Sequence, residues 1–91
     1  ALAMIGEAAV PALVTALADP RQPVRVRAAA ALRKTLGEAL AGLTLNDYPP
    51  AYWPALTAMY HALNDPNRLV RQHAYEAIDR LGLFDQVYFS P

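Results

Sequence analysis

The sequence predicts an all-α fold of antiparallel helix pairs, and two observations support this prediction. A segment from the first third of the chain recurs 46 residues further on, and in both copies the apolar residues are spaced three or four apart, as on one face of a helix. Alanine is abundant where strands would need β-branched residues, and runs of alternating apolar and polar residues are absent. Only residues 86–89 have a composition that favours an extended conformation.

The recurring segment contains two short motifs. Residues Ala16–Pro20 read Ala-Leu-Ala-Asp-Pro and recur as Ala-Leu-Asn-Asp-Pro at Ala62–Pro66. The pair Val24–Arg25 recurs as Val70–Arg71, and eight of the seventeen residues from 16 to 32 are identical in the later copy. The chain therefore contains two copies of one structural unit.

The first unit, residues 10–37, is expected to form two helices. The apolar stripe of its first helix is Val10, Leu13, Val14 and Leu17. Pro11 suits the first turn of that helix, where a missing N–H costs nothing, and Asp19–Pro20 ends it, because a residue before proline is disfavoured in the α region. The second helix is expected to begin near Pro23 and to end at Gly37 as its C′ residue. Its apolar positions are Val24, Ala28, Ala31, Leu32 and Thr35.

The second unit, residues 53–82, repeats this plan. Its first helix has an apolar stripe of Trp53, Leu56, Tyr60 and Leu63, and Asp65–Pro66 is expected to end it. Its second helix has Val70, Ala74, Ala77, Ile78 and Leu81 on one face. Gly82 is expected to follow that helix as its C′ residue.

These motifs resemble HEAT repeats, and more closely the short PBS-lyase-like branch of that family. The pattern of that branch is roughly Ile-Gly, Ala-Val-Pro-Ala-Leu, Leu-x-Asp-Pro, Val-Arg and Ala-Ala-x-Ala-Leu. The first unit has Ile5–Gly6, Ala9–Leu13, Leu17–Pro20, Val24–Arg25 and Ala28–Leu32, and the second keeps Pro54–Leu56, Leu63–Pro66, Val70–Arg71, Ala74 and Ala77–Ile78. The resemblance implies an α-solenoid in which helix pairs form a right-handed superhelical stack.

The resemblance also implies structural roles for four recurring charged residues. In such repeats the Asp before Pro caps a helix start and accepts hydrogen bonds from the guanidinium of the neighbouring unit. By resemblance these roles fall to Asp19, Arg25, Asp65 and Arg71. They are therefore expected to hold the stack together rather than to bind a partner.

The chain is expected to form a single domain, 1–91, with five parts. Because Gly6–Ala8 matches Gly37–Ala39, residues 1–9 are interpreted as the end of an upstream repeat. Residues 10–37 form the first repeat, 38–52 an insertion, 53–82 the second repeat and 83–91 a tail. All eight aromatic residues lie from Tyr48 onward, which indicates a bulky, cap-like terminal unit of a longer solenoid.

The insertion departs most from the family pattern. It brings Tyr48, Tyr52 and Trp53 close together, and these are residue types favoured in protein interfaces. Two interpretations remain open: a hydrophobic strap over the groove between the repeats, or a contact with a partner. The aromatic tail has the same two interpretations.

The sequence predicts that the chain is a non-catalytic protein-interaction scaffold in the cytoplasm. Its binding wall is expected on the second helix of each unit. The residues expected there are Arg27, Arg33, Lys34, Gln72, His73 and Glu76, with Asp79 and Arg80 nearby. Tyr48, Tyr52 and Trp53 of the insertion complete the candidate set.

Several other classes of function find no support in the sequence. The formal net charge is zero, whereas nucleic-acid binders usually have a basic excess. There is no cysteine, no apolar run of the roughly 18 residues that a membrane span needs, and no phosphate-binding loop or HExxH pair. No catalytic residue, cofactor or metal site is predicted.

Two alternatives remain. The branch name implies, by resemblance, a subunit or chaperone of a phycobilin lyase system that handles the attachment of bilins to proteins. The second alternative is that the chain associates with itself. An incomplete repeat at the N-terminus leaves an apolar face that a second copy of the chain could cover.

Overall fold

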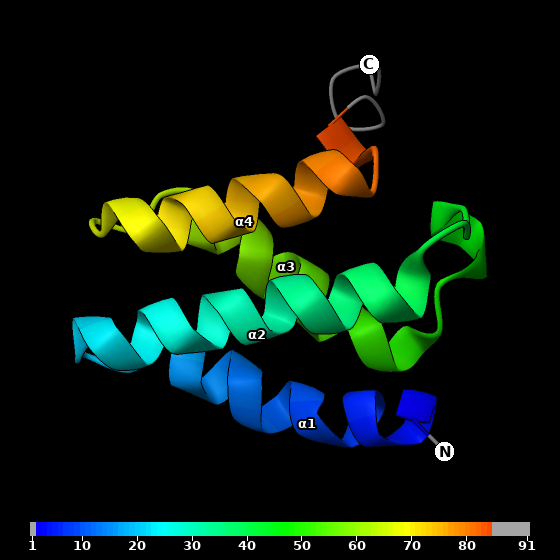
Figure 1. Ribbon diagram of the computed structural model, residues 1–91, viewed down its shortest axis with the longest axis horizontal. Helices are drawn as coiled ribbons and strands as arrows, with labels where there is room; N and C mark the ends of the chain where they lie inside the picture. The colour runs from blue at the N-terminus through cyan, green and yellow to red at the C-terminus, as the bar shows by residue number, and fades with distance from the viewer. Residues whose placement is uncertain (1, 85–91) are drawn as a thin grey trace.

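The computed structural model describes residues 2–84, and the side chains of residues 7–84 (Figure 1). It contains four α-helices: α1 (Leu2–Leu17), α2 (Gln22–Leu40), α3 (Trp53–Ala62) and α4 (Arg68–Arg80). Two short 3₁₀ turns, η1 (Leu45–Asp47) and η2 (Pro50–Tyr52), join α2 to α3. The described part of the chain has no strand, which confirms the all-α prediction, while residues 86–89 lie outside it.

The helices form two antiparallel pairs that lie side by side. Helix α1 packs on α2, and α3 packs on α4. Across the junction between the pairs, α2 lies along α4 and α1 lies along α3, so α2 occupies the middle of the array in Figure 1 and α4 its edge. Because α2 has the two largest helix–helix contacts, its side chains link both pairs.

Two helix boundaries differ from the sequence-based expectation. Helix α1 runs without a break through Pro11, where a helix start was expected. A proline inside a helix removes one hydrogen bond, but the alanine-rich flanks favour the helix and Val10 is only 1% exposed. Helix α2 continues past Gly37 to Leu40, because Leu36 and Leu40 lie on one stripe and are both buried. Gly42, with φ of 80°, follows instead.

The boundaries set by the Asp-Pro motifs agree with the expectation. Helix α1 ends at Leu17 and α3 at Ala62, each just before its Asp-Pro pair. Gly82 has φ of 72° and lies just after α4, as expected for a C′ glycine.

The helices form two layers, α1 with α3 and α2 with α4, and the core lies between these layers. Its largest fully buried side chains come from all four helices and from η2: Val10, Leu32, Leu36, Leu40, Tyr52, Met59, Val70 and Ile78. Alanines at Ala29, Ala55 and Ala74 have no exposed surface, so neighbouring helices approach closely there.

The insertion packs onto the helices as a strap. Tyr48 is 4% and Tyr52 is 2% exposed, and both belong to the core cluster. Trp53, the next residue, is 45% exposed. Of the two interpretations left open, burial of Tyr48 and Tyr52 matches the strap, so the hypothesis that these two tyrosines contact a partner is corrected, whereas Trp53 is presented to solvent.

Tyr52→Ala should lower the free energy of unfolding by about 3 kcal/mol, because it leaves a cavity in the core. Trp53→Ala, the adjacent aromatic, should change it by less than about 1 kcal/mol, because much of the side chain is already in water. Urea unfolding of both variants would check this. Equal losses would contradict the assignment of the insertion as a strap closed by Tyr52.

Candidate functional site

An ion pair joins the two helix pairs at the end where the Asp-Pro motifs lie. Arg25 of α2 donates from Nε to Oδ2 of Asp65 at 2.9 Å and from Nη2 to Oδ1 at 3.3 Å. Both side chains are only 12% exposed. The third nitrogen of Arg25, Nη1, donates to the carbonyl oxygens of Asp19 and Pro20, each at 3.0 Å. One guanidinium therefore holds its own loop and the loop of the next pair.

Arg71 repeats half of this arrangement. Its Nη1 donates to the carbonyl oxygens of Asp65 at 2.8 Å and Pro66 at 3.0 Å, as Arg25 does in the first loop. Among the described residues, no group accepts a hydrogen bond from its Nε or Nη2. The predicted link between units is thus made once, by Arg25 and Asp65, and Arg71 keeps a free edge.

The expected capping role of the two aspartates is corrected. The carboxylates of Asp19 and Asp65 each accept from the backbone N–H two residues on, at 2.8 Å, and so stabilise the turn before the helix. The cap of α4 is Asn67, whose Oδ1 accepts from the backbone N–H groups of Leu69 and Val70. Asn67 also donates to Gln22 across the junction at 2.8 Å.

The Asp19 carboxylate pairs with Arg21 and not with Arg25. It accepts from Nε and Nη2 of Arg21, both at 3.0 Å, while Arg25 reaches only the backbone carbonyl of Asp19. The Arg21 side chain and its backbone N–H hold the pKa of Asp19 at about 2, below the ordinary 3.8. The Arg21 side chain is 74% exposed, so salt screens this pair.

The predicted wall on α2 and α4 exists, but its central charges neutralise one another. Arg33 donates from Nη1 to Oε2 of Glu76 at 2.6 Å, and both side chains are about two-fifths exposed. Gln72 donates to the other oxygen of Glu76 at 3.4 Å. Arg27 and Lys34 are exposed and form no described hydrogen bond, and His73 is half-buried. Asp79 and Arg80 are exposed at the C-terminal part of α4.

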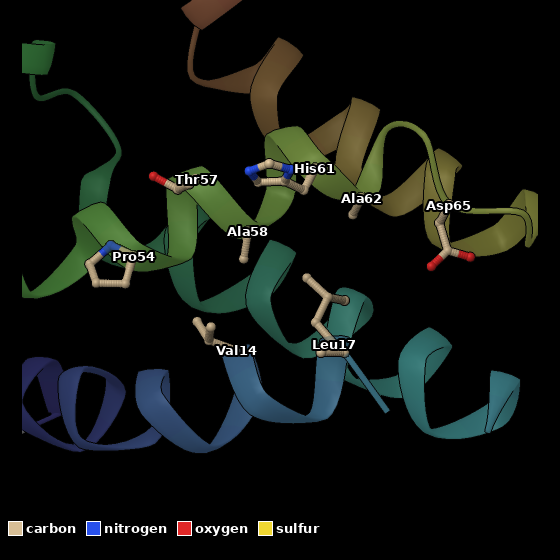
Figure 2. Close-up of a pocket in the computed structure, with 9 residues that line it drawn as sticks. Val14, Leu17, Pro54, Thr57, Ala58, His61, Ala62 and Asp65 are labelled. Atoms are coloured by element: carbon tan, nitrogen blue, oxygen red, sulfur yellow. The ribbon is translucent and has the colours of Figure 1, made fainter. Parts of the chain in front are cut away.

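The structure also shows a groove that the sequence reasoning missed. It has a volume of about 570 Å³ and lies between α1 and α3, on the side away from α2 and α4 (Figure 2). The residues that line it are Val14, Leu17, Ala18, Pro54, Thr57, Ala58, His61, Ala62 and Asp65. Most of them are apolar, and the polar groups of Thr57, His61 and Asp65 lie along its α3 side and one end.

The sequence signal for this groove was present but ambiguous. Val14 and Leu17 fit the apolar stripe of α1, so both were counted as core. A stripe does not show how much of it the neighbouring helix covers, and only the packing leaves Val14 half-buried. A single histidine such as His61 carries no sequence signal for a groove, and in the structure it is exposed and lines the groove.

Within residues 2–84, no three histidine, cysteine, aspartate or glutamate side chains gather where they could hold a metal ion. Over the same residues, none of the helices combines the length and the apolar character that a bilayer crossing requires.

Comparisons with known proteins give no relative. The chain matches no protein-family model, and neither the curated proteins nor the solved structures contain a significant match.

Asp65→Asn should lower the free energy of unfolding by about 2–3 kcal/mol, since it leaves the Arg25 charge unpaired in a mostly buried place. Asp19→Asn is the matched control at the equivalent position and should cost much less, because its partner is exposed. Chemical unfolding at neutral pH would measure both. A loss for Asp19→Asn as large as that for Asp65→Asn would contradict the assigned role of the Arg25–Asp65 pair.

Arg21→Ala should raise the pKa of Asp19 from about 2 towards 3.8, because it removes the main group that stabilises the carboxylate. In the wild type the pair stabilises the fold above pH 4, and this contribution is lost as the pH falls from about 4 through 2. Carboxyl ¹³C shifts recorded against pH would follow the titration. An Asp19 pKa that stays near 2 in the variant would refute this cause.

Proposed function

We propose that the chain is a non-catalytic protein-interaction module of the HEAT type, and that the groove between α1 and α3 receives an amphipathic helix of another protein. The observation that carries the proposal is the lining of the groove: a continuous apolar surface open to solvent, bordered on one side by polar groups. Such a surface is typical of helix-in-groove recognition.

The HEAT assignment draws support from the recurring arginine clamp. Arg25 and Arg71, 46 residues apart, each hold the two carbonyl oxygens of an Asp-Pro loop with Nη1. Arg25 then ties its helix pair to the next one through Asp65. A contact that repeats with the sequence and connects successive pairs is what a stacked repeat array needs.

The size of the lining residues supports a helix as the bound element. Ala18, Ala58 and Ala62 are small, so a third helix could approach the backbones of α1 and α3 closely. Val14, Leu17 and Pro54 supply apolar surface that the bound helix would remove from water. Thr57 and His61 offer hydrogen bonds to the polar edge of that helix.

The wall on α2 and α4 is the weaker candidate for the main contact. Arg33 and Gln72 each already donate to Glu76, and a partner would have to compete with those bonds. Arg27 and Lys34 remain free for additional contacts with an acidic partner. Their charge would speed association more than it would strengthen binding.

Amphipathic helical peptides selected from a displayed library on the wild-type chain should bind Ala58→Arg at least about tenfold more weakly, because the arginine fills the groove and puts a charge against apolar side chains. Thr57→Arg, at an exposed lining position, provides a second variant that leaves the core intact. Ala12→Arg makes the same change on an exposed position of α1 outside the groove, and it should leave binding unchanged. Fluorescence anisotropy would measure the dissociation constants.

Two results would count against the proposal. Selected peptides that bind both groove variants as tightly as the wild type would exclude the groove, and a library from which no peptide is enriched would exclude helix recognition. The phycobilin alternative is tested alongside with free bilin: a shift of its visible absorption on mixing, followed by transfer to an apo-phycobiliprotein, would favour that alternative over the module proposed here.

A further inference from the structure

A second hollow lies on the outer face of the α3–α4 pair, which has no helix packed on it in the described part of the chain. It has a volume of about 520 Å³ and is lined by Leu63, Arg68, Arg71, Gln72, Tyr75 and Glu76, which we call the Arg71 face. In Figure 1, α4, which supplies most of these residues, lies at the edge of the array opposite α1.

The first helix pair shows what the Arg71 face is able to bind. There, Nη1 of Arg25 is fixed by two loop carbonyls, and the remaining edge of the guanidinium receives the carboxylate of Asp65 with two hydrogen bonds. Arg71 has the same clamp on Nη1, with the same two types of acceptor. Its Nε and Nη2 are therefore held in position for a carboxylate before any ligand arrives, which reduces the entropy lost on binding.

The charges around Arg71 favour an acidic ligand. Arg68 contributes a second guanidinium to the hollow. Glu76 is already bound by Arg33 and Gln72, so its charge is largely compensated. Asp79 lies eight residues along α4, about 12 Å from the position of Arg71. Among the described residues, the lining of the hollow thus presents two cations and no uncompensated carboxylate.

Apolar surface lies next to these cations. Tyr75 is 56% exposed, and one part of its ring packs against Phe84 with centroids 4.9 Å apart. Leu63 lines the other side of the hollow. The face therefore offers a carboxylate site and an adjacent apolar contact, the combination that a short peptide segment can use.

A second copy of this chain fits the Arg71 face poorly. At the internal junction Ala29, which has no exposed surface, lets the helices meet, but its counterpart on the outer face is the bulky Tyr75. Gln22 bonds to Asn67 at that junction. In a second copy stacked the same way, Arg68 would replace the glutamine and Arg21 the asparagine, so two like charges would face each other. The occupant should be acidic and should lack an arginine at that place.

We propose that the Arg71 face binds a short acidic segment of another protein, with an aspartate or glutamate carboxylate on Nε and Nη2 of Arg71 and an apolar side chain against Leu63 and Tyr75. This surface is separate from the groove between α1 and α3, so either proposal stands without the other.

The test uses a capped hexapeptide, Ala-Leu-Asn-Asp-Pro-Asn, which copies residues 62–67, the segment that Arg25 holds within the chain. Titrated into ¹⁵N-labelled protein, it should move the Nε–H resonance of Arg71 in a saturable way and leave that of Arg80 in place. The peptide with Asn in place of its Asp should bind about tenfold more weakly, because it loses the charge-assisted pair. Both comparisons use wild-type protein, so they do not depend on the folding of a variant.

Protein variants then distinguish binding of the peptide at Arg71 from non-specific attraction between opposite charges. Arg71→Lys keeps the charge but loses the bidentate hydrogen bond to a carboxylate, and it should weaken peptide binding about tenfold. Arg80→Gln removes an exposed cation of the same helix and should leave binding unchanged, as should Ala58→Arg in the groove. The proposal is overturned if the Arg71 resonance does not move, or if the Asn peptide or Arg71→Lys binds as tightly. A shift of the Arg71 resonance on raising the protein concentration alone would instead assign the face to a second copy.

Discussion

The structure depends on one guanidinium. Arg25 fixes the loop that ends α1 through two carbonyl oxygens, and it grips the carboxylate of Asp65 in the loop that ends α3. One loop connects α1 to α2 and the other connects α3 to α4. The Arg25 side chain therefore bonds to the loops that join four helix ends. Because both side chains are only 12% exposed, water competes little for the pair. Loss of either partner would leave the charge of the other unpaired. Ala29 of α2 and Ala74 of α4, which have no exposed surface, lie in the two helices that this pair brings together.

The two candidate surfaces follow from how the pairs are joined. The Arg25–Asp65 pair ties α2 to the loop before α4, and the Arg33–Glu76 pair ties α2 to α4 itself, so the central charges on that side are already paired. On the opposite side α1 and α3 meet without an ion pair between described residues, and their small side chains leave the apolar groove open. Both proposed binding surfaces, the groove and the Arg71 face, thus lie where the molecule's own packing is least complete.

The sequence predicted helix boundaries correctly where the residues next to the boundary decide it, and wrongly where burial in the fold decides it. The Asp-Pro pairs end α1 and α3 as predicted, because proline restricts the residue before it whatever the surroundings. Pro11 and Gly37 were predicted as helix boundaries for equally local reasons, yet both lie inside helices. There the burial of Val10, Leu36 and Leu40 outweighs the local preference. The aromatic insertion could be narrowed only to a strap or a partner contact, since a tyrosine serves equally well in either.

The sequence by itself determined that the chain is helical, that one unit occurs twice and that Asp19, Arg25, Asp65 and Arg71 recur at equivalent places. The tertiary structure decided what each of the four does. Equivalent positions in a repeat have similar residues next to them in the sequence, but different residues lie next to them in the fold. A charged side chain bonds to a partner that lies within about 3 Å of it. Arg25 has a following loop within reach and forms a mostly buried pair, whereas Asp19 pairs with Arg21, and Nε and Nη2 of Arg71 meet no acceptor among the described residues.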